Sequence, residues 1–347
     1  MNVTSVAIVI LNFNGKNFLE KFLPGILKHS SGHKIHVADN GSTDDSIRYL
    51  NTNFPQVNVI AIKDNCGYAK GYNTALKQIA ADYYVLLNSD VEVTANWVEP
   101  IIELMQKNKK IAACQPKLLD FKHRELFEYA GASGGFIDTY GYPFCRGRIF
   151  NSLEKDNGQY NNSTEVFWAT GACLFVNANA FWEVGGLDED YFAHMEEIDL
   201  CWRLKNVGYS IYVEPTSIVY HVGGGTLNKV SSRKTFLNFR NNLITLTKNH
   251  PSNILFLKIF YRLSLDGIAA LKFLFAAQPK HFWAVIRSHF AYYYLLPQTL
   301  SKRKKQKNSP NFKYNRSFTY KGNIVFDHFL KGKKKFTDLE KDRFFNS

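Results

Sequence analysis

Near its N-terminus the chain reads Val6-Ala7-Ile8-Val9-Ile10-Leu11, an uninterrupted apolar run of the length expected for a buried β-strand. Two more runs of this kind follow, at residues 34–38 and 57–62. Segments with the apolar spacing of helices separate the runs, at residues 16–28, 45–53 and 69–80. Alternating strands and helices are typical of a parallel sheet covered by helices, so the chain is predicted to open with an α/β domain.

A fourth apolar run, residues 83–87, ends in the polar residues Asn88-Ser89-Asp90. This places a carboxylate at the carboxyl end of a predicted strand, the edge at which open α/β sheets bind their ligands. Three later elements are predicted, a strand at 172–176, a helix at 196–206 and a strand near 209–213. Residues 111–165 have weak periodicity, so we expect loops and short strands there that form a substrate wall.

The length of 347 residues sets the expected domain organisation. Single hydrophobic cores rarely grow beyond about 250 to 300 residues, so one main core with an extension is expected. The composition, with 45% hydrophobic and 15% aromatic residues, is ample for such a core and excludes a disordered chain. We predict a main α/β domain at 1–240, an amphipathic helical region at 241–300 and a basic tail at 301–347.

Cysteine usage and the first residues indicate where the protein resides. The five cysteines are scattered and form no C-x-x-C pair, which argues against a disulfide framework or a zinc site. The first apolar run has no basic residues before it and is too short for a signal peptide or a membrane span. We therefore expect a protein of the reducing cytoplasm.

Two motifs that follow predicted strands carry carboxylates. Asp39-Asn40-Gly41-Ser42-Thr43-Asp44 opens a predicted helix, where Asp39 suits a hydrogen bond from the N–H group of a nucleotide base. The same residue types are also favoured in ordinary turns and N-caps. In Asn88-Ser89-Asp90-Val91-Glu92, Asp90 suits Mg²⁺ or Mn²⁺, because such ions prefer oxygen ligands and can bridge a diphosphate. A strand-terminating turn is the alternative interpretation.

Glu196-Glu197-Ile198-Asp199 places three carboxylates at the start of a predicted helix. One interpretation is a favourable interaction with the helix dipole, and the other is a general base that deprotonates an acceptor hydroxyl. His221 follows an apolar run at residues 217–220 and is either a structural histidine or a ligand to the same metal ion. The next segment, Gly223-Gly224-Gly225, would let a loop close over a diphosphate.

Taken in order, these segments resemble the inverting family 2 glycosyltransferases, in particular the rhamnosyltransferase-like branch that builds bacterial surface polysaccharides. The matching segments are residues 9–15, 39–44, 65–73, 87–90, 171–172, 185–188, 196–204, 208–209 and His221. The resemblance implies the GT-A nucleotide-diphospho-sugar transferase fold, a Rossmann-like mixed sheet flanked by helices.

The resemblance also implies roles for eight residues. The nucleotide sugar would be bound by Asn12, Asp39, Asn73 and Asn88, with Asp39 contacting a uracil or thymine base. The metal ion, Mg²⁺ or Mn²⁺, would be bound by Asp90 and His221. The base would be Glu197, with Asp199 as the alternative, because the family usually has Glu-Asp where this chain has Glu196-Glu197.

The resemblance implies transfer of a sugar, with rhamnose favoured, from a thymidine or uridine diphosphate sugar to a hydroxyl of a glycan or lipid-linked acceptor. Peripheral attachment to the inner face of the cell membrane is expected. Two other functions stay open. A nucleotidyltransferase would carry a glycine-rich, basic triphosphate loop near the first strand, which residues 11–16 lack. A non-catalytic membrane-bound scaffold with the same fold would not need Glu197 or Asp90 for its role.

The C-terminal part begins with a pattern that suits a membrane surface. Residues 254–277 are strongly apolar, but four charged residues interrupt them at helical spacing: Lys258, Arg262, Asp266 and Lys272. A spanning helix does not readily accept four charges. We therefore expect an amphipathic helical extension that lies in a membrane interface or packs against the main domain.

Aromatic residues at 283 and 292–294 precede a basic cluster at 302–307, a combination that suits anionic lipid headgroups. Residues 301–347 carry 14 Lys and Arg against 4 Asp and Glu, so most of the net charge of +13 lies at this end of the chain. No recognisable nucleic-acid-binding module accompanies these charges. A membrane surface is therefore an expected partner, and nucleic acid is not.

Overall fold

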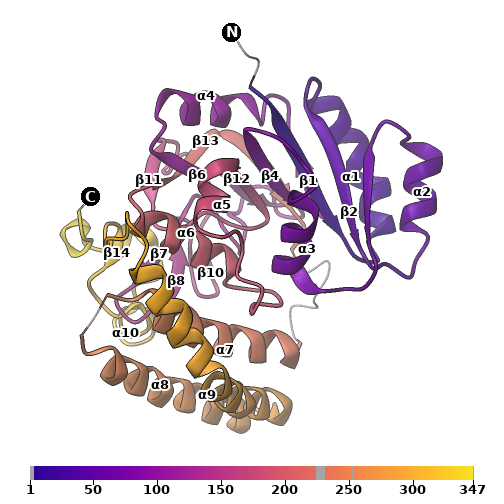
Figure 1. Ribbon diagram of the computed structural model, residues 1–347. Helices are drawn as coiled ribbons and strands as arrows, with labels where there is room; N and C mark the ends of the chain where they lie inside the picture. The colour runs from indigo at the N-terminus through magenta and orange to yellow at the C-terminus, as the bar shows by residue number, and fades with distance from the viewer. Residues whose placement is uncertain (1–3, 224–230, 252, 347) are drawn as a thin grey trace.

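The computed structural model describes residues 4–223, 231–251 and 253–346, and its largest feature is a mixed β-sheet (Figure 1). The first half of this sheet has four parallel strands: β1 (Val6–Asn12), β2 (Lys34–Asn40), β3 (Asn58–Ile62) and β4 (Tyr83–Asn88). The helices between them are α1 (Lys16–His29), α2 (Ser46–Asn53) and α3 (Gly67–Leu76). The predicted α/β opening is confirmed.

The second half of the sheet contains strands of both directions. These strands are β5 (Val91–Val93), β6 (Ile111–Asp120), β11 (Thr164–Val166), β12 (Cys173–Asn177) and β13 (Ser210–His221). The order across the sheet is β11-β13-β6-β12-β4-β1-β2-β3, with β5 paired to β13. Because β12 runs antiparallel to β4, it begins at the edge where β4 and its parallel neighbours end. Residues from both halves of the sheet meet at this edge.

Helices cover both faces of the sheet, and their packing explains why β1 is apolar from Val6 to Leu11. Residues 6, 8 and 10 belong to a core shared with α1, α2 and α4 (Glu99–Lys107). Residues 7 and 9 belong to the opposite core, shared with α3, α5 (Ala178–Glu183) and α6 (Glu196–Asn206). Successive side chains of a strand point to opposite faces, so a strand buried on both sides needs apolar residues throughout.

Strand β6 lies in the region that was expected to contain only loops and short strands. It spans ten residues, and all but the last are buried. Its sequence includes Pro116 and Lys117, which are unusual in a central strand and weaken the strand pattern. The Lys117 ammonium is compensated by an ion pair with Asp156, at 2.7 Å. A partner 39 residues away in the sequence therefore makes this buried position possible.

A second, smaller sheet includes a strand from the C-terminal end of the chain. Its strands are β7 (Gly135–Asp138), β8 (Pro143–Cys145), β9 (Arg148–Ile149), β10 (Ser152–Leu153) and β14 (Thr319–Tyr320), in the order β10-β9-β8-β7-β14. Within residues 301–347, predicted as a basic tail, β14 pairs with β7. The rings of Phe336 and Phe344 also pack on Phe136, because aromatic residues interspersed among the lysines can be buried there. Two short 3₁₀ helices complete this end, at Phe336–Asp338 and Lys341–Arg343.

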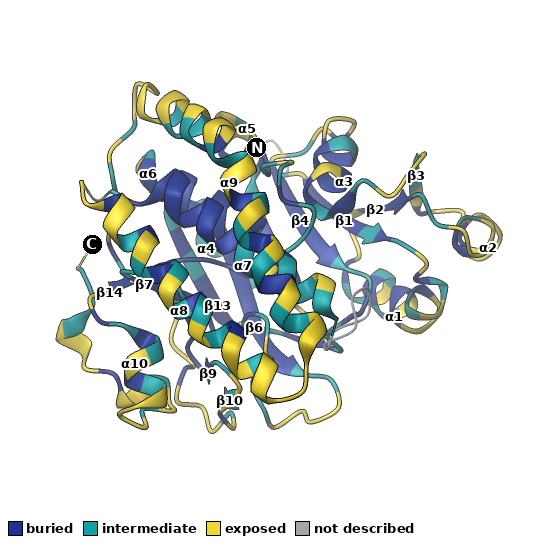
Figure 2. Ribbon diagram, turned by 90° about the horizontal axis from the view of Figure 1, so that it is seen from below, coloured by how far each residue is buried: buried dark blue, intermediate teal, exposed yellow. Residues whose placement is uncertain are grey.

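The remaining C-terminal residues form four helices: α7 (Ser232–Asn249), α8 (Leu255–Phe275), α9 (Pro279–Lys307) and α10 (Ile324–Phe329). Helix α7 packs against α6, α8 and α9 (Figure 1). The charged side of α8 faces the protein, where Arg262 Nη1 donates hydrogen bonds of 2.7 Å to the Tyr140 carbonyl and to Asn242 Oδ1. The apolar side of α8 is exposed (Figure 2).

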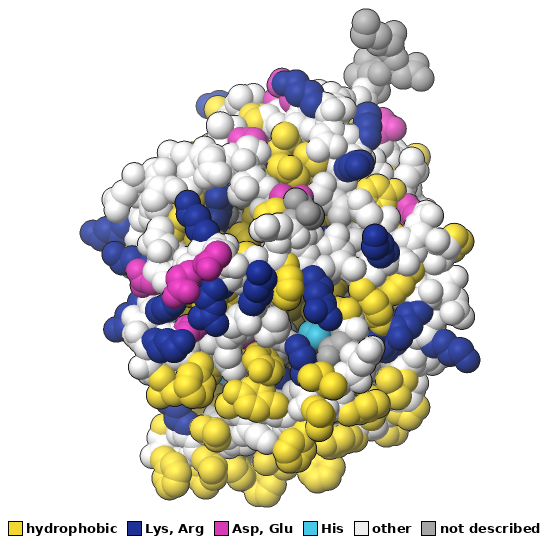
Figure 3. All heavy atoms as spheres, turned by 90° about the vertical axis from the view of Figure 1, so that its left-hand side faces the viewer, with side chains coloured by type: hydrophobic (Ala, Val, Ile, Leu, Met, Phe, Trp, Pro, Cys, Tyr) yellow, Lys and Arg dark blue, Asp and Glu magenta, His cyan; other side chains and the backbone are white. Residues whose placement is uncertain are grey.

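Seen from the side, hydrophobic side chains gather at the end of the molecule formed by α8 and α9 (Figure 3). Within the described residues, none of the helices combines the length and the apolar character needed to cross a membrane.

Candidate active site

The sheet edge where β1, β2 and β4 end brings together three residues predicted to bind a nucleotide sugar. The strand register places Asn12 beside Asp39, and Leu11, the neighbour of Asn12 in the chain, beside Asn88. Asn12 and Asp39 are buried, whereas Asn88 is partly exposed. These side chains line one edge because parallel strands end in the same direction.

Asn12 and Asp39 form a fixed pair. Asn12 Nδ2 donates a hydrogen bond of 2.9 Å to Asp39 Oδ1, and the backbone N–H of Ser42 donates one of 3.0 Å to Asp39 Oδ2. Asn12 Oδ1 is buried and accepts no hydrogen bond within the described part of the chain. A Cβ atom on Gly15 would lie 2.4 Å from this oxygen, so only glycine fits there. The pair therefore keeps one buried acceptor available for a ligand.

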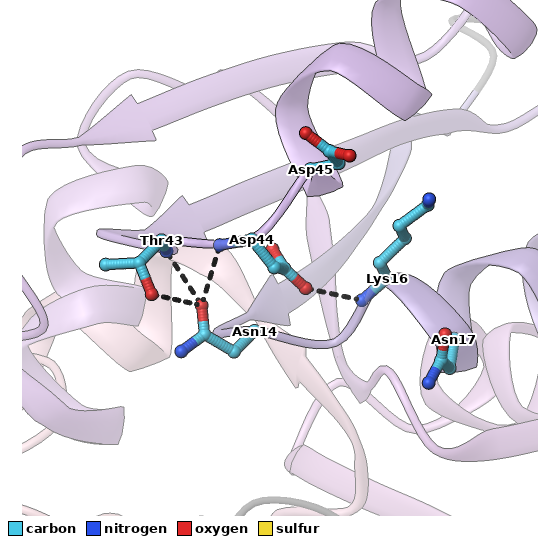
Figure 4. Close-up of a pocket in the computed structure, with 6 residues that line it drawn as sticks. All are labelled: Asn14, Lys16, Asn17, Thr43, Asp44 and Asp45. Carbon is cyan, nitrogen blue, oxygen red and sulfur yellow. Dashed lines mark hydrogen bonds between the residues drawn. The ribbon is translucent and has the colours of Figure 1, made fainter.

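Asn14 stabilises the turn that follows Asp39 through hydrogen bonds. Its Oδ1 atom accepts hydrogen bonds from the backbone N–H groups of Thr43 and Asp44, at 2.7 and 3.2 Å (Figure 4). A polar cavity of about 470 Å³ lies here, at the starts of α1 and α2. Its lining is Asn14, Lys16, Asn17, Thr43, Asp44 and Asp45. The matching segment 9–15 included Asn14, but its contact with residues 43 and 44 has no signal in the sequence.

A second loop closes on the same turn. Asn40 Nδ2 donates to the carbonyl of Gly67 at 3.1 Å and to Asn65 Oδ1 at 3.2 Å. Gly41 has a positive φ of 76°, and a Cβ atom on it would lie 2.6 Å from the backbone nitrogen of Asn65. Glycine is required at this position for both reasons. Residues 65–73, one of the segments that resemble the family, thus begin in contact with the Asp39 turn.

Asp90 and His221, the two predicted metal ligands, lie next to each other. His221 Nε2 is 3.2 Å from Asp90 Oδ1, and His221 Nδ1 is 3.1 Å from Glu128 Oε1, with all three residues buried. Burial alone lowers the pKa of His221, but the Glu128 and Asp90 carboxylates outweigh it and raise that pKa to about 10. Glu128 was not predicted, because it lies in a segment without a recognisable motif.

Glu196 and Glu197 begin α6 with carboxyl groups that are incompletely paired. The Oε2 atom of each is enclosed and has no hydrogen-bond partner within the described residues. Burial raises the pKa of Glu197 to about 7, although backbone N–H groups favour its ionised form. Burial also raises the pKa of Glu196, and the Glu197 carboxylate raises it further. Glu196 is buried, whereas Glu197 is partly exposed as a residue although its Oε2 atom is enclosed, so Glu197 is the one of the two that lies nearer to solvent.

The turn before α6 has an unusual backbone. His194 and Met195 have positive φ angles of 71° and 74°, which non-glycine residues rarely adopt. Asn241 of α7 donates hydrogen bonds to the carbonyls of Ala193 and His194, at 2.9 and 2.8 Å. Such conformations persist where surrounding contacts enforce them, and they are common at active sites. Helix α7 therefore fixes the turn that presents Glu197.

Two predicted site residues are fully engaged in structural contacts. Asp199 is buried, and its oxygens pair with Arg203 Nε at 2.8 Å and with Lys248 Nζ and Asn249 Nδ2 at 2.7 Å. Asn73 Nδ2 donates to the Leu187 carbonyl at 2.8 Å, and its Oδ1 accepts from the Leu187 N–H at 3.0 Å. Asn73 ties α3 to the turn at residues 187–189, whereas Asp199 ties α6 to α7. Of the predicted glycine loop after His221, Gly224 and Gly225 lie outside the described residues.

Comparison with solved structures supports the GT-A fold. The crystal structure of GalNAc-T7 with UDP, GalNAc and Mn²⁺ matches with a TM-score of 0.55 and 15% identity, over 71% of this chain and 48% of that chain. The mannosyltransferase PcManGT from Pyrobaculum calidifontis, in complex with GDP-Man and Mn²⁺, matches with a TM-score of 0.51 and 12% identity, over 84% of this chain and 88% of that chain. The predicted GT-A fold is confirmed.

Comparison of sequences identifies the family. The model of "Glycosyl transferase family 2" matches residues 7–184, more than half of the chain. The N-acetylglucosaminyl-diphospho-decaprenol L-rhamnosyltransferase of Mycobacterium tuberculosis is 25% identical over 237 residues, which are 63% of this chain and 76% of that protein. Rhamnosyltransferase WbbL of Escherichia coli K12 is 24% identical over 224 residues, 62% of this chain and 83% of that protein. This protein therefore belongs to glycosyl transferase family 2 and is similar to its rhamnosyltransferases.

Proposed function

We propose that this glycosyltransferase moves a sugar, with rhamnose favoured, from a thymidine or uridine diphosphate donor to a hydroxyl group, with inversion at the transferred carbon. The observation that carries the proposal is the placement of Glu197. Glu197 is a partly exposed residue in the first turn of α6, its carboxyl group has a pKa that burial raises to about 7, and a strained turn holds this end of the helix. A carboxylate with that pKa is suited to accept a proton near neutral pH.

The Asn12–Asp39 pair would bind the nucleotide base. Asn12 Oδ1 is a buried acceptor without a partner in the described structure, and such an atom is costly unless a ligand pairs with it. An N–H group of a pyrimidine base is a suitable donor for this oxygen or for the Asp39 carboxylate. Asn88, at the end of the neighbouring β4, would contact the phosphate or sugar part of the donor. We do not include Asn73, because both ends of its amide already bond Leu187.

Asp90 and His221 fit a divalent cation by their chemistry. Asp90 Oδ1 and His221 Nε2 lie 3.2 Å apart; the carboxylate suits Mn²⁺ or Mg²⁺, and the imidazole nitrogen would become a ligand for Mn²⁺ on losing the proton that the two carboxylates stabilise. No cluster of three or more protein ligands is present among the described residues, so diphosphate oxygens and water would supply the rest of the coordination. A bound cation would neutralise charge on the departing diphosphate. Glu128 would hold the His221 ring in place through its other nitrogen.

Glu197 would act as the general base. Its carboxylate would take the proton of the acceptor hydroxyl while that oxygen attacks the sugar carbon opposite the diphosphate, which inverts the configuration. Glu196, whose pKa burial raises, would stay protonated and leave the negative charge on Glu197. Asp199 is a poor candidate for this role, because Arg203, Lys248 and Asn249 already bind its oxygens.

The acceptor is proposed to be a lipid-linked or free glycan at the inner face of the cell membrane. The printed name of the Mycobacterium tuberculosis relative describes an acceptor that carries a decaprenol chain. Within this chain, residues 1–240 would carry catalysis and residues 241–300 would contact the membrane. The exposed apolar side of α8 supports that division.

A donor panel tests the proposed function. Purified protein is incubated with thymidine- and uridine-diphosphate sugars, Mg²⁺ or Mn²⁺ and a lipid-linked acceptor, and nucleoside diphosphate release is measured. Release from one donor that EDTA abolishes would support the metal-dependent transferase. Glu197→Gln is the test variant and should lose this release. Its matched control is Glu103→Gln, which changes an exposed glutamate on α4 and should leave release unchanged. Absence of release with every donor would favour the non-catalytic scaffold.

A further inference from the structure

Helix α8 presents an apolar side to solvent instead of to the protein. Its exposed hydrophobic side chains share one side of the helix: Phe256, Leu257, Phe260, Ile268, Leu271, Leu274 and Phe275. Phe260 is 70% exposed and Phe275 is 85% exposed. Most amphipathic helices of globular proteins bury this kind of surface. The arrangement of α8 is therefore the reverse of the usual one.

Two neighbouring helices extend this surface. The exposed hydrophobic residues of α9 are Trp283, Phe290, Tyr293 and Tyr294, and those of α10 and the residue that caps it are Phe326, Phe329 and Leu330. Helix α9 packs along α8, and Lys272 of α8 lies 5.4 Å from the centre of the Phe329 ring of α10. We call these fourteen residues of α8, α9 and α10 the apolar cap. Figure 3 shows hydrophobic side chains gathered over this end of the molecule.

Contacts on the opposite side of α8 prevent the helix from turning its apolar side inward. Arg262 is buried, bonds Tyr140 and Asn242, and lies with its guanidinium 3.6 Å from the centre of the Tyr142 ring. Asp266 is also buried and lies 3.5 Å from His289 of α9. Rotation of the helix would break these contacts and leave the Tyr140 carbonyl and the buried Asn242 Oδ1 without this donor. The exposure of the cap is thus fixed by the fold.

The charge around the cap favours an anionic partner. Residues 254–307 contain ten Lys and Arg, and Asp266, which is buried, is the one acidic residue among them. Lys272, Lys280 and Arg287 are exposed on the helices that form the cap. Figure 3 also shows many Lys and Arg side chains next to the hydrophobic end. A second copy of this surface would bring like charges together, which opposes self-association through the cap.

We propose that the apolar cap docks on the surface of an anionic lipid bilayer, with α8 lying in the boundary between headgroups and acyl chains. Trp and Tyr are enriched at that boundary, and basic residues around an apolar face bind anionic headgroups. This deepens the proposed function and rests on it in one respect, because the bilayer would be the source of the lipid-linked acceptor. Docking itself requires no turnover.

The contacts between helices connect the cap to the proposed active site. Arg262 of α8 bonds Asn242 of α7, and the adjacent Asn241 bonds the turn that precedes Glu196. One helix, α7, therefore lies between the membrane-binding surface and the residues that present Glu197. A bilayer bound at the cap would hold the acceptor-binding side of the enzyme near the lipid headgroups.

The experiment measures co-sedimentation of the full chain with vesicles. One set contains phosphatidylcholine alone and the other contains about 30% phosphatidylglycerol, a typical anionic content for such assays. The test variant is Phe260→Gln with Phe290→Gln, and the matched control is Tyr129→Gln with Leu153→Gln, which changes two exposed hydrophobic residues outside the cap. Thermal unfolding of each variant confirms that the protein is folded. Donor hydrolysis without a lipid acceptor reports the catalytic site separately.

We expect the unaltered protein to partition into anionic vesicles at least about tenfold more strongly than into neutral ones. The Phe260 and Phe290 variant should lose about tenfold or more of this binding, while the control variant and the donor hydrolysis stay unchanged. Equal binding by both variants, or no binding by the unaltered protein, would overturn the proposal. A concentration-dependent dimer that only the Phe260 and Phe290 variant abolishes would also overturn it. Loss of hydrolysis in every sample with normal vesicle binding would instead count against the proposed function.

Discussion

The side-chain amide of Asn241 lies 2.8 Å from the carbonyl oxygen of His194, and this hydrogen bond joins α7 to the turn that precedes Glu196. His194 is one of two successive residues with positive φ, a conformation that costs about 1–3 kcal/mol for each non-glycine residue. The bond offsets part of that cost. It also means that the geometry at Glu197 depends on a helix beyond the matched family region, residues 7–184.

Replacement Asn241→Ala should lower kcat more than it raises KM, because the base would be misplaced while the donor pocket stays intact. We expect a loss of about 1–3 kcal/mol in the free energy of unfolding, since two carbonyl groups lose their donor. Steady-state kinetics and urea unfolding provide the two measurements. Asn53→Ala is the control, because that exposed amide bonds its own helix at the Tyr49 carbonyl. An unchanged kcat in a destabilised Asn241→Ala protein would show a purely structural role.

The activity should rise with pH across neutrality. A general base works in its ionised form, and burial raises the pKa of Glu197 to about 7. Below that pH the carboxyl group is protonated and cannot accept the hydroxyl proton, so kcat/KM should increase with pH and level off above about 8. A pH–rate profile in a constant-ionic-strength buffer measures this. A flat profile between about pH 6 and 8 would contradict the assignment.

Asn12→Ala should weaken binding of the nucleoside diphosphate by about tenfold, because it removes the buried acceptor and one donor to Asp39. Calorimetric titration with the nucleoside diphosphate measures the Kd without catalysis. Asn17→Ala is an informative control, since Asn17 lines the neighbouring cavity but does not contact Asp39. If Asn17→Ala weakens binding and Asn12→Ala does not, the donor occupies that cavity and the proposed pocket is wrong.

Glu128→Gln should reduce Mn²⁺ affinity about 10- to 100-fold in the presence of the nucleoside diphosphate, because His221 would lose the carboxylate that orients it. Asp90→Asn should reduce the affinity further. Electron paramagnetic resonance of free Mn²⁺ follows binding directly. Glu92→Gln serves as the control, since Glu92 pairs with Arg124 on the surface. Mn²⁺ binding that neither Glu128→Gln nor Asp90→Asn weakens would exclude the Asp90–His221 site.

Much of the sheet could be predicted because its signals are local. β1 is buried on both faces, so its sequence is apolar from Val6 to Leu11, and the helices beside it have clear periodicity. The predicted helix 196–206 matches α6 at both ends. β6 could not be found in the same way, because Lys117 fits only with Asp156 as a distant partner. The packing of residues 301–347 could not be predicted either, because it depends on contacts of their aromatic rings with β7 and β8.

The site residues likewise divide into those that lie in local motifs and those that contacts between distant segments bring to the site. Asp90 and His221 occur in recognisable motifs, and the fold does bring them together. Glu128 and Asn241 have no motif, and their positions follow only from how distant segments pack. Asn73 and Asp199 illustrate the opposite case, because their motifs are clear but their polar atoms bond other parts of the protein. Sequence patterns identify which residues matter near the site more readily than they identify which ones remain available to a substrate.

The assignment of Glu197 as the base of a sugar transfer predicts a large kinetic effect of Glu197→Gln. The measurement is nucleoside diphosphate release by the unaltered protein and by this variant, at pH 8 with Mn²⁺, the preferred donor and the acceptor. We predict that the variant loses about 10²- to 10⁴-fold in kcat, with donor affinity unchanged, because Gln retains the size of Glu but cannot accept the proton. A Glu197→Gln protein that turns over at the rate of the unaltered protein would contradict the account.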